Sequence, residues 1–212
     1  MQTSAKKKMG RPLTPRLSRK AIGRAALAMF EAGEDLSLPK LAERLEVTQS
    51  SFYKHVSGRQ EIIELARGAL VERARVPEQF PDTLDGVIRQ TFEALISAYR
   101  LVPALLPLLL TQPVTHPAAL GLYDHFVAAF EKAGVPAHLI IPAIEALDSA
   151  AIGASLDAFA MEAAWSIDEG RQESYPHLSM ALDAVAASKT DRFTFLADVL
   201  AAGLKAAIDD TA

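Results

Sequence analysis

The sequence predicts an all-α protein, and three observations support this fold class. Apolar residues recur at the 3.6-residue spacing of amphipathic helices along most of the chain. No alternation of apolar and polar residues typical of a strand extends beyond a few positions. Alanine and leucine, which favour helices, dominate the second half. With 212 residues, half of them hydrophobic, the chain is long enough to bury a substantial core.

A disordered basic arm is expected over residues 1–17. This segment is polar and basic, and Gly10, Pro12 and Pro15 interrupt any helical pattern. Its lysines are not followed by an apolar stretch and a cleavage site, so it does not resemble a secretory signal. Short basic arms can contact a DNA backbone or minor groove, or remain flexible without a defined contact, and both alternatives stay open.

Two amphipathic helices follow the arm. Ser18 is a favoured N-cap residue, the apolar residues after it recur at helical spacing, and Gly33 supplies a C-terminal stop. Ser37 then caps a short second helix that ends near Leu45. Pro39 is compatible with this helix because it lies in the first turn.

A third helix, from Thr48 to about His55, has an unusually polar surface. Its only large candidate for burial is Phe52, and the other side chains are available to solvent. Core packing does not explain such a helix, whereas a DNA major groove suits it. Two short helices joined by a tight turn, the second with an exposed polar face, predict a helix-turn-helix.

The rest of the chain is predicted to be helical as well. Ser57 with Gln60 resembles a capping box that opens a fourth helix linking the head to the body. Pro142 is expected to kink or restart the longest body segment, and residues 166–190 are too mixed to assign. The remaining helices are expected near residues 83–100, 103–111, 117–133, 137–163 and 191–209.

Charge divides the chain into two unlike parts. The net charge of the whole chain is −4. Residues 1–60 hold 12 Lys and Arg against 5 Asp and Glu, a net charge of +7, and residues 61–212 hold 10 against 21, a net charge of −11. A basic head on an acidic body is typical of a protein that binds phosphate backbones. A solvated basic tail is the simpler alternative.

The sequence of the predicted head resembles the TetR family of transcriptional regulators. The resemblance is carried by Leu36–Ala42 and above all by Val47–Val56, and it covers about residues 18–70. Segments 135–159 and 193–204 are similar to the body of tetracycline-repressor-type members. The resemblance implies a helix-turn-helix DNA-binding domain over 18–64 and a helical effector-binding and dimerisation domain over 65–212.

The resemblance also implies which head residues contact DNA. Gln49, Ser50 and Lys54 would face base edges, and both Gln and Lys have side chains suited to base recognition. Packing is the alternative role for the aromatic and histidine side chains. The residues expected to contact phosphates are Ser51, Tyr53, His55 and Arg59, with Lys40 as a further candidate.

Three head residues depart from the family pattern. Leu38 and Pro39 stand where the tetracycline repressor has a polar residue and an arginine, so the operator should differ and the third helix should carry more of the base recognition. Glu46 stands where the turn commonly has glycine, and we expect a cost of about 1 kcal/mol if the turn requires a left-handed residue.

Members of the family are dimers in which the last two long helices of each subunit form a four-helix bundle. In this chain those helices correspond to about 137–163 and 191–209. For any single residue, an intramolecular core is the alternative role. The residues predicted for the dimer interface are Ile144, Leu147, Ala151, Ile152, Leu156, Phe193, Leu196, Leu200 and Leu204.

A small-molecule pocket is expected among the helices of residues 83–133. Aromatic and leucine residues at helical spacing also occur in ordinary cores, and this alternative stays open. Tyr99 and Tyr123 are favoured because a buried hydroxyl requires a partner. The residues predicted to line the pocket are Phe92, Tyr99, Leu109, Tyr123 and Phe126.

No metal, cofactor or catalytic site is predicted. The five histidines show no metal-binding spacing, and residues 107–112 lack the histidine with which tetracycline repressors hold magnesium. A largely apolar effector is therefore expected. The absence of cysteine fits a cytoplasmic location, and the longest apolar run, residues 101–110, is broken by Pro103 and Pro107 and is too short to cross a membrane.

These observations predict a cytoplasmic homodimeric repressor that a small-molecule effector releases from a palindromic DNA operator. A helical dimer that binds a ligand or protein without binding DNA is the main alternative. An enzyme is disfavoured, because the pairs Asp124–His125 and Ser155–Asp157 match no known catalytic arrangement.

Overall fold

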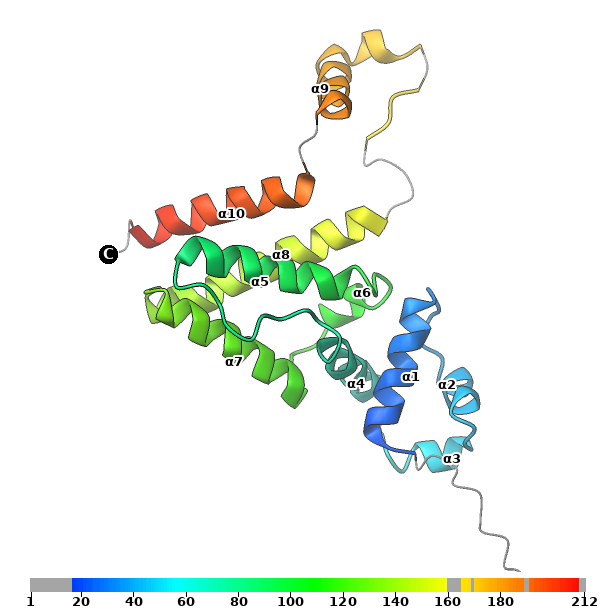
Figure 1. Ribbon diagram of the computed structural model, residues 1–212. Helices are drawn as coiled ribbons and strands as arrows, with labels where there is room; N and C mark the ends of the chain where they lie inside the picture. Colours follow the sequence, from blue (N-terminus) through cyan, green and yellow to red (C-terminus); the bar gives the residue numbers. More distant parts are fainter. Residues whose placement is uncertain (1–16, 160–164, 169, 189–190, 210–212) are drawn as a thin grey trace, which may run out of the picture.

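The computed structural model describes residues 17–159, 165–168, 170–188 and 191–209, and every regular element in these ranges is a helix. The predicted all-α fold is confirmed. The first three helices form a small head, which the fourth helix joins to a helical body (Figure 1). The α-helices are α1 (Arg19–Glu31), α2 (Leu38–Arg44), α3 (Gln49–Phe52), α4 (Arg59–Val71), α5 (Leu84–Tyr99), α6 (Leu106–Leu109), α7 (Pro117–Lys132), α8 (Ala137–Phe159), α9 (Pro176–Ala187) and α10 (Arg192–Asp209), with a 3-10 turn η1 at Gln172–Ser174.

The predicted N-caps hold for α1 and α3 but not for α2. Ser18 Oγ accepts a hydrogen bond from the Ala21 amide at 3.1 Å, and the Thr48 hydroxyl accepts one from the Ser51 amide at 3.3 Å. Ser37 occupies the N-cap position of α2 without such a bond. Pro39 in the first turn has no N–H, so α2 begins with one donor fewer to satisfy.

The turn after α2 does require a left-handed residue, and Glu46 occupies that position with φ of 53°. The Val47 amide donates to Ala42 O at 3.0 Å and the Glu46 amide donates to Glu43 O at 2.9 Å. These two bonds form a Schellman motif. The left-handed residue of this motif is normally glycine, and Gly33 occupies the equivalent position after α1.

Two predictions about the end of the head need correction. The predicted helix from Thr48 to His55 is α-helical only from Gln49 to Phe52, and the amides of Lys54 and His55 donate to carbonyls three residues back, which tightens the last turn. The predicted capping box of Ser57 with Gln60 does not form, because Gly58 is the N-cap residue of α4 and no side chain caps the helix. Glu61 Oε2 accepts the Ser57 amide at 2.6 Å and the Ser57 hydroxyl at 2.8 Å, because α4 begins one residue later than predicted.

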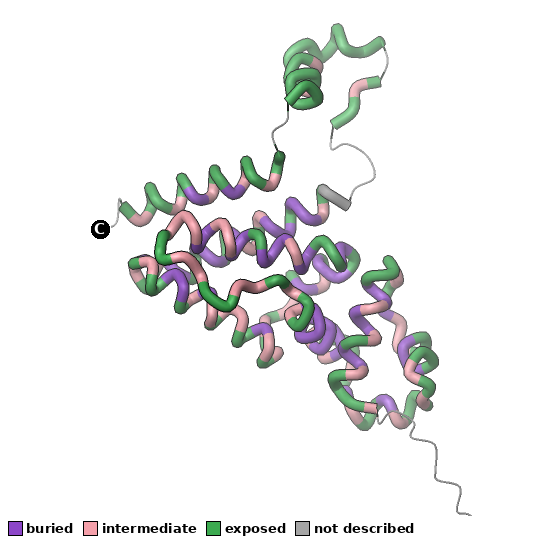
Figure 2. Tube along the Cα trace, viewed as in Figure 1, coloured by how far each residue is buried: buried purple, intermediate pink, exposed green. Residues whose placement is uncertain are grey.

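The head and body share a continuous core. Helix α1 packs extensively against α4, α4 in turn contacts α6 and α7, and α5 packs against α8 and α10. Figure 2 shows buried residues concentrated along these contacts, while the outer faces are exposed. Phe30 and Phe52 are fully buried in the head, and Phe126 and Phe130 in the body. Helix α4 therefore connects the two parts through packed side chains.

Helix α8 runs through Pro142 without a break, so the predicted restart there is wrong. Pro142 is only the sixth residue of the helix, and its missing N–H removes a single hydrogen bond near the end. Residues 160–163 of the predicted segment lie outside the described residues. Helix α6 is shorter than predicted, four residues within 103–111.

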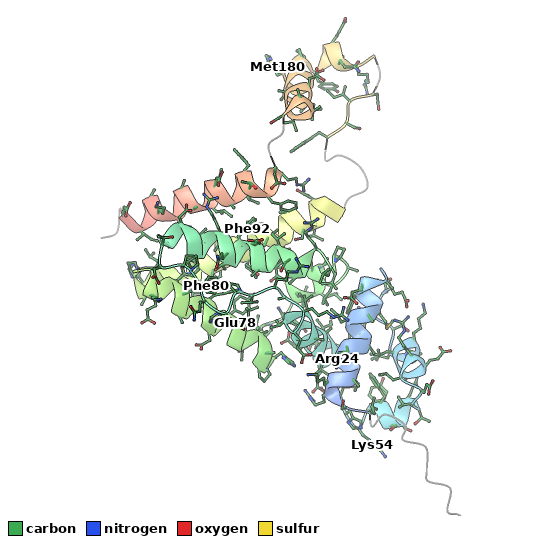
Figure 3. All side chains as sticks on the ribbon, viewed as in Figure 1. Arg24, Lys54, Glu78, Phe80, Phe92 and Met180 are labelled. Atoms are coloured by element: carbon green, nitrogen blue, oxygen red, sulfur yellow. The ribbon has the colours of Figure 1, made fainter. Side chains whose placement is uncertain are left out.

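Residues 176–187 form a helix that the sequence analysis left unassigned. Helix α9 packs mainly against η1 and has no buried residue. It lies apart from the body, and its apolar side chains Met180 and Val185 are exposed (Figures 1 and 3).

One described helix has the length and composition of a membrane span. Residues 137–157 of α8 have a mean hydropathy of 1.5, and 39% of them are buried inside the chain. Core helices of soluble proteins share this composition. Glu145 and Asp148 divide this segment, so it is not an uninterrupted apolar run in the sequence.

Candidate nucleic-acid interface and effector cavity

The predicted DNA-binding residues of α3 lie together at one end of the head. Gln49, Ser50 and Lys54 are exposed, as is Tyr53, whose side chain is 53% accessible. Figure 3 places Lys54 at the tip of the head, away from the body. The α3 face is defined here as Gln49, Ser50, Ser51, Tyr53, Lys54 and His55, and buried Phe52 anchors it to the head core.

The α3 face contains side chains with no intramolecular role in the described structure. Within the described residues, Gln49 and Lys54 form no side-chain hydrogen bond or ion pair, and Lys40 on α2 is likewise exposed without one. Ser51 and His55 are half-buried. Polar groups free of internal partners are available to bases and phosphates.

Arg59 has a structural contact that the sequence did not predict. Its Nη1 donates to Leu36 O at 2.8 Å and so ties the start of α4 to the segment before α2. Arg19 similarly donates to His55 O at 3.3 Å and pairs with Glu61. Arg59 remains exposed, so the phosphate contact proposed for it is compatible with this bond.

Part of the basic charge of the head is neutralised internally. Lys20 and Arg24 both pair with Glu72, at 2.7 and 3.0 Å, and Arg44 pairs with Glu34 at 2.8 Å. The net charge of the segment therefore overstates the cations available to DNA. Lys40 and Lys54, which form no ion pair in the described structure, are the most available.

A small cavity lies between α4, α5, α6 and α7. Its volume is about 30 Å³, the space of roughly one water, whereas sites for drug-sized ligands measure about 300–1,000 Å³. The described conformation is therefore closed around this cavity. Its lining residues are Arg67, Leu70, Val71, Ala74, Ala94, Leu95, Ala98, Tyr99, Leu109, Ala119, Leu122 and Tyr123.

Three of the five predicted pocket residues line this cavity, namely Tyr99, Leu109 and Tyr123. The structure places the other two, Phe92 and Phe126, in the core with 2% and 0% exposure. Figure 3 shows Phe92 among the body helices. For these two phenylalanines, the core alternative describes the observed position.

The two tyrosine hydroxyls have a common partner. Tyr99 donates to Asp148 Oδ1, and Tyr123 donates to the same oxygen at 3.3 Å. Burial raises the pKa of Tyr123 to about 12, and burial also raises the pKa of Tyr99 well above its ordinary value. Asp148 was missed by sequence reasoning, although a lone acidic residue beside the buried positions Ile144, Leu147 and Ala151 was a detectable signal.

A buried ion pair joins the cavity to the head helix α4. Arg67 Nε donates to Glu64 Oε1 at 2.6 Å, and Arg67 Nη2 donates to Leu109 O at 3.0 Å. Glu64 Oε2 accepts the amides of Thr115 and His116 at 2.8 and 3.0 Å. The Glu64–Arg67 pair therefore fixes α4 to the segment between α6 and α7.

The protonation of Glu64 follows from these contacts. Burial acts to raise its pKa, but the Thr115 amide and the Arg67 guanidinium outweigh burial and hold the pKa below its ordinary value of 4.5. Glu64 is therefore ionised at neutral pH. Close packing accompanies the pair, because a Cβ atom added to Gly68 would lie 2.1 Å from the His116 ring.

Comparison with known sequences finds two transcription regulators. An HTH-type transcriptional regulator from Saccharopolyspora erythraea is 30% identical over 146 residues, which cover 66% of this chain and 60% of the relative. The HTH-type transcriptional repressor DrrR1 from Streptomyces coeruleorubidus is 26% identical over 148 residues, 66% of this chain and 53% of the relative. The chain thus spans little more than half the length of these curated relatives. No family model matches the chain.

Comparison with solved structures decides the fold. The TetR family protein ActR from Streptomyces coelicolor, in complex with actinorhodin, superposes with a TM-score of 0.76 at 19% identity, covering 93% of this chain and all of ActR. A single-residue variant of TetR from Acinetobacter baumannii, in complex with minocycline, gives 0.64 at 21% identity, covering 90% of this chain and 97% of that one. The chain has the TetR fold. The fold that the resemblance of the sequence implied is thereby confirmed.

In this TetR fold, the residues of α8 and α10 that were predicted for the dimer interface pack partly or wholly within the single chain. Ile144, Leu147, Ala151 and Ile152 are buried within the chain. Leu156, Phe193, Leu196, Leu200 and Leu204 are half-buried. The exposed apolar side chains on α8 and α10 are instead Ile141, Phe195 and Val199, at 53%, 60% and 50%.

The described residues of the TetR fold bring no metal-binding cluster together. None of the described His, Asp and Glu residues form a group of three that could hold a metal ion. His125 contacts Pro77 O at 3.0 Å and the Phe80 ring, and Asp157 lies 3.8 Å from Arg192. Of the two residue pairs considered for catalysis, His125 and Asp157 thus have structural contacts, and Ser155 Oγ is buried without a hydrogen-bond partner among the described residues.

Proposed function

We propose that this protein is a TetR-like DNA-binding transcriptional regulator, a repressor that a largely apolar small-molecule effector releases from a palindromic operator. The observation that carries the proposal is the exposed α3 face, whose polar side chains Gln49 and Lys54 lack internal partners in the described structure. The two curated relatives, a regulator and a repressor, support the same function. A cytoplasmic location follows from it.

The proposed active form is a homodimer. Reading a palindrome requires two heads about 34–36 Å apart, so that each α3 face enters one of two successive major grooves. The exposed apolar residues Ile141, Phe195 and Val199 supply unburied surface on α8 and α10. The half-buried leucines of α10 would extend this surface, whereas the buried residues of α8 would support it from within.

The proposed release mechanism depends on the Glu64–Arg67 pair. The closed cavity has to widen to admit an effector, and Arg67 both lines the cavity and binds Leu109 O. Widening would displace α6 relative to α4 and so change the angle of the head. Effector binding and operator binding would then oppose each other reciprocally.

The proposal is tested by binding to duplex fragments from upstream of the gene itself. The full-length protein should prefer one fragment to a scrambled duplex, and its affinity should fall as salt concentration rises, because phosphate contacts release counterions. Lys54→Ala should weaken binding and reduce the salt slope, whereas Lys205→Ala, an exposed lysine on α10, should leave both unchanged. Absence of both sequence preference and salt dependence would instead favour a ligand- or protein-binding module without DNA.

A further inference from the structure

A carboxylate beside the cavity has no cationic partner in the described part of the chain. Asp148 on α8 accepts hydrogen bonds from Tyr99 and Tyr123, both at Oδ1, and no described Lys, Arg or His forms an ion pair with it. Oδ2 receives no hydrogen bond from the described residues. Burial raises the pKa of Asp148, against the lowering effect of the two phenols and of the nearby Arg67 charge.

The positive charge at the cavity is already neutralised. Arg67 is bound to Glu64 at 2.6 Å, and its Nη2 donates to Leu109 O at 3.0 Å and to Gln112 O at 3.4 Å. The positive charge of Arg67 is balanced by the negative charge of Glu64, so the negative charge of the Asp148 carboxylate has no balancing positive charge. An uncompensated charge in an apolar environment is costly, so a ligand that brings a positive charge would interact favourably there.

The lining of the cavity, next to which Asp148 binds the hydroxyls of Tyr99 and Tyr123, suits an apolar group. Leucine, valine and alanine side chains form most of its lining, and its four alanines, Ala74, Ala94, Ala98 and Ala119, limit the bulk that a ligand has to displace. The rings of Tyr99 and Tyr123 belong to the same lining and can also attract a cation through their faces. Cationic and apolar recognition therefore meet at one site.

We propose that the effector is an amphipathic cation, an apolar aromatic body carrying a protonated amine that binds Asp148 between Tyr99 and Tyr123. The proposal rests on the proposed function only in naming this ligand an effector. Arg67 is a weaker anchor for an acidic group, because its Nε is bound to Glu64 and its Nη2 to the carbonyl oxygens of Leu109 and Gln112.

Three matched probes test the ligand class on the full chain by thermal unfolding. These are 1-naphthylmethylamine, 1-naphthylmethanol and 1-naphthoic acid, at the same millimolar concentration and neutral pH. A ligand that binds the folded state raises the melting temperature in proportion to its affinity. The amine should raise it more than the alcohol and the acid. An acid or alcohol shift equal to the amine shift would overturn the proposal.

Substitution of the carboxylate tests its role directly. Asp148→Asn keeps the size and the acceptor for the tyrosines but removes the charge, so it should weaken amine binding by about tenfold and leave alcohol binding unchanged. Glu145→Gln, an exposed position on the same helix, is the matched control and should retain the amine preference. An amine preference that persists in Asp148→Asn would overturn the proposal. If that variant does not fold, the wild-type ranking of the probes decides.

A separate readout distinguishes this inference from the proposed function. Operator binding is measured with and without the amine at the concentration that raises the melting temperature. Weaker operator binding supports both proposals. An amine that binds through Asp148 and leaves DNA affinity unchanged supports the ligand class and contradicts the regulatory function.

Discussion

The Glu64–Arg67 pair gives the sharpest prediction about stability. Glu64→Gln removes the carboxylate that receives Arg67 Nε and the amides of Thr115 and His116. The side chains of Arg67 and Glu64 are only 9% and 12% exposed, so solvent screens the pair weakly. Loss of a buried charged hydrogen bond costs about 1.5–3 kcal/mol, and we expect the free energy of unfolding to fall by about 2 kcal/mol at pH 7.

The pH dependence of this effect has a defined sign. The pKa of Glu64 is lower in the folded chain, so its stabilisation is present above the ordinary value of 4.5 and is lost as pH falls through the lower folded pKa. The difference between wild type and Glu64→Gln should therefore shrink below about pH 4.5. Urea unfolding at pH 7 and at steps down to pH 4 measures it.

A surface ion pair provides the matched control. Glu34→Gln removes the partner of Arg44, whose side chain is 40% exposed against 32% for Glu34, so we expect a change below about 1 kcal/mol. Equal effects of Glu34→Gln and Glu64→Gln at pH 7 would refute the reasoning. A Glu64→Gln deficit that is unchanged at low pH would refute it too.

Three further predictions concern packing, a turn and the buried phenols. Gly68→Ala should destabilise the chain by about 1–3 kcal/mol because the added Cβ atom has no room, whereas Gly121→Ala, with open space around it, should be neutral or stabilising. Thermal unfolding of the two variants checks this prediction, and equal effects would contradict it. Glu46→Gly should stabilise the chain by about 1 kcal/mol in urea unfolding because its φ is 53°, and a loss of stability would count against the strain argument. Tyr99 and Tyr123 should stay protonated as pH rises past 10, because burial raises their pKa values. The phenolate absorbance near 295 nm should therefore stay below that of four ionised tyrosines until the chain unfolds. Absorbance equal to four phenolates in the folded state would contradict this prediction.

Local signals account for most of the fold that the sequence predicted. Caps such as Ser18 and Thr48, and the glycine at the end of α1, act through bonds to residues two to five positions away, so they are visible in the sequence. The polar α3 face was also predictable, because a helix whose only large buried candidate is Phe52 does not suit a core. The length of α3 could not be predicted in this way, because the tightened last turn is set by backbone hydrogen bonds.

Long-range contacts account for what the sequence did not predict. Glu64 binds Thr115 and His116 across about fifty positions, and Asp148 joins Tyr99 and Tyr123 from a third helix. No spacing rule connects residues so far apart. Phe92 and Tyr99 also have similar helical patterns, and only packing places one in the core and the other at the cavity.

The central claim is that the α3 face reads DNA bases, and Gln49→Ala tests it most directly. The measurement is the affinity of wild type and variant for the preferred upstream duplex and for a scrambled duplex at one fixed salt concentration. A lost bidentate base contact costs about 1–3 kcal/mol, so affinity for the preferred duplex should fall by about 5- to 150-fold while affinity for the scrambled duplex stays the same. Equal affinities of wild type and variant for the preferred duplex, or an equal loss on both duplexes, would contradict the claim.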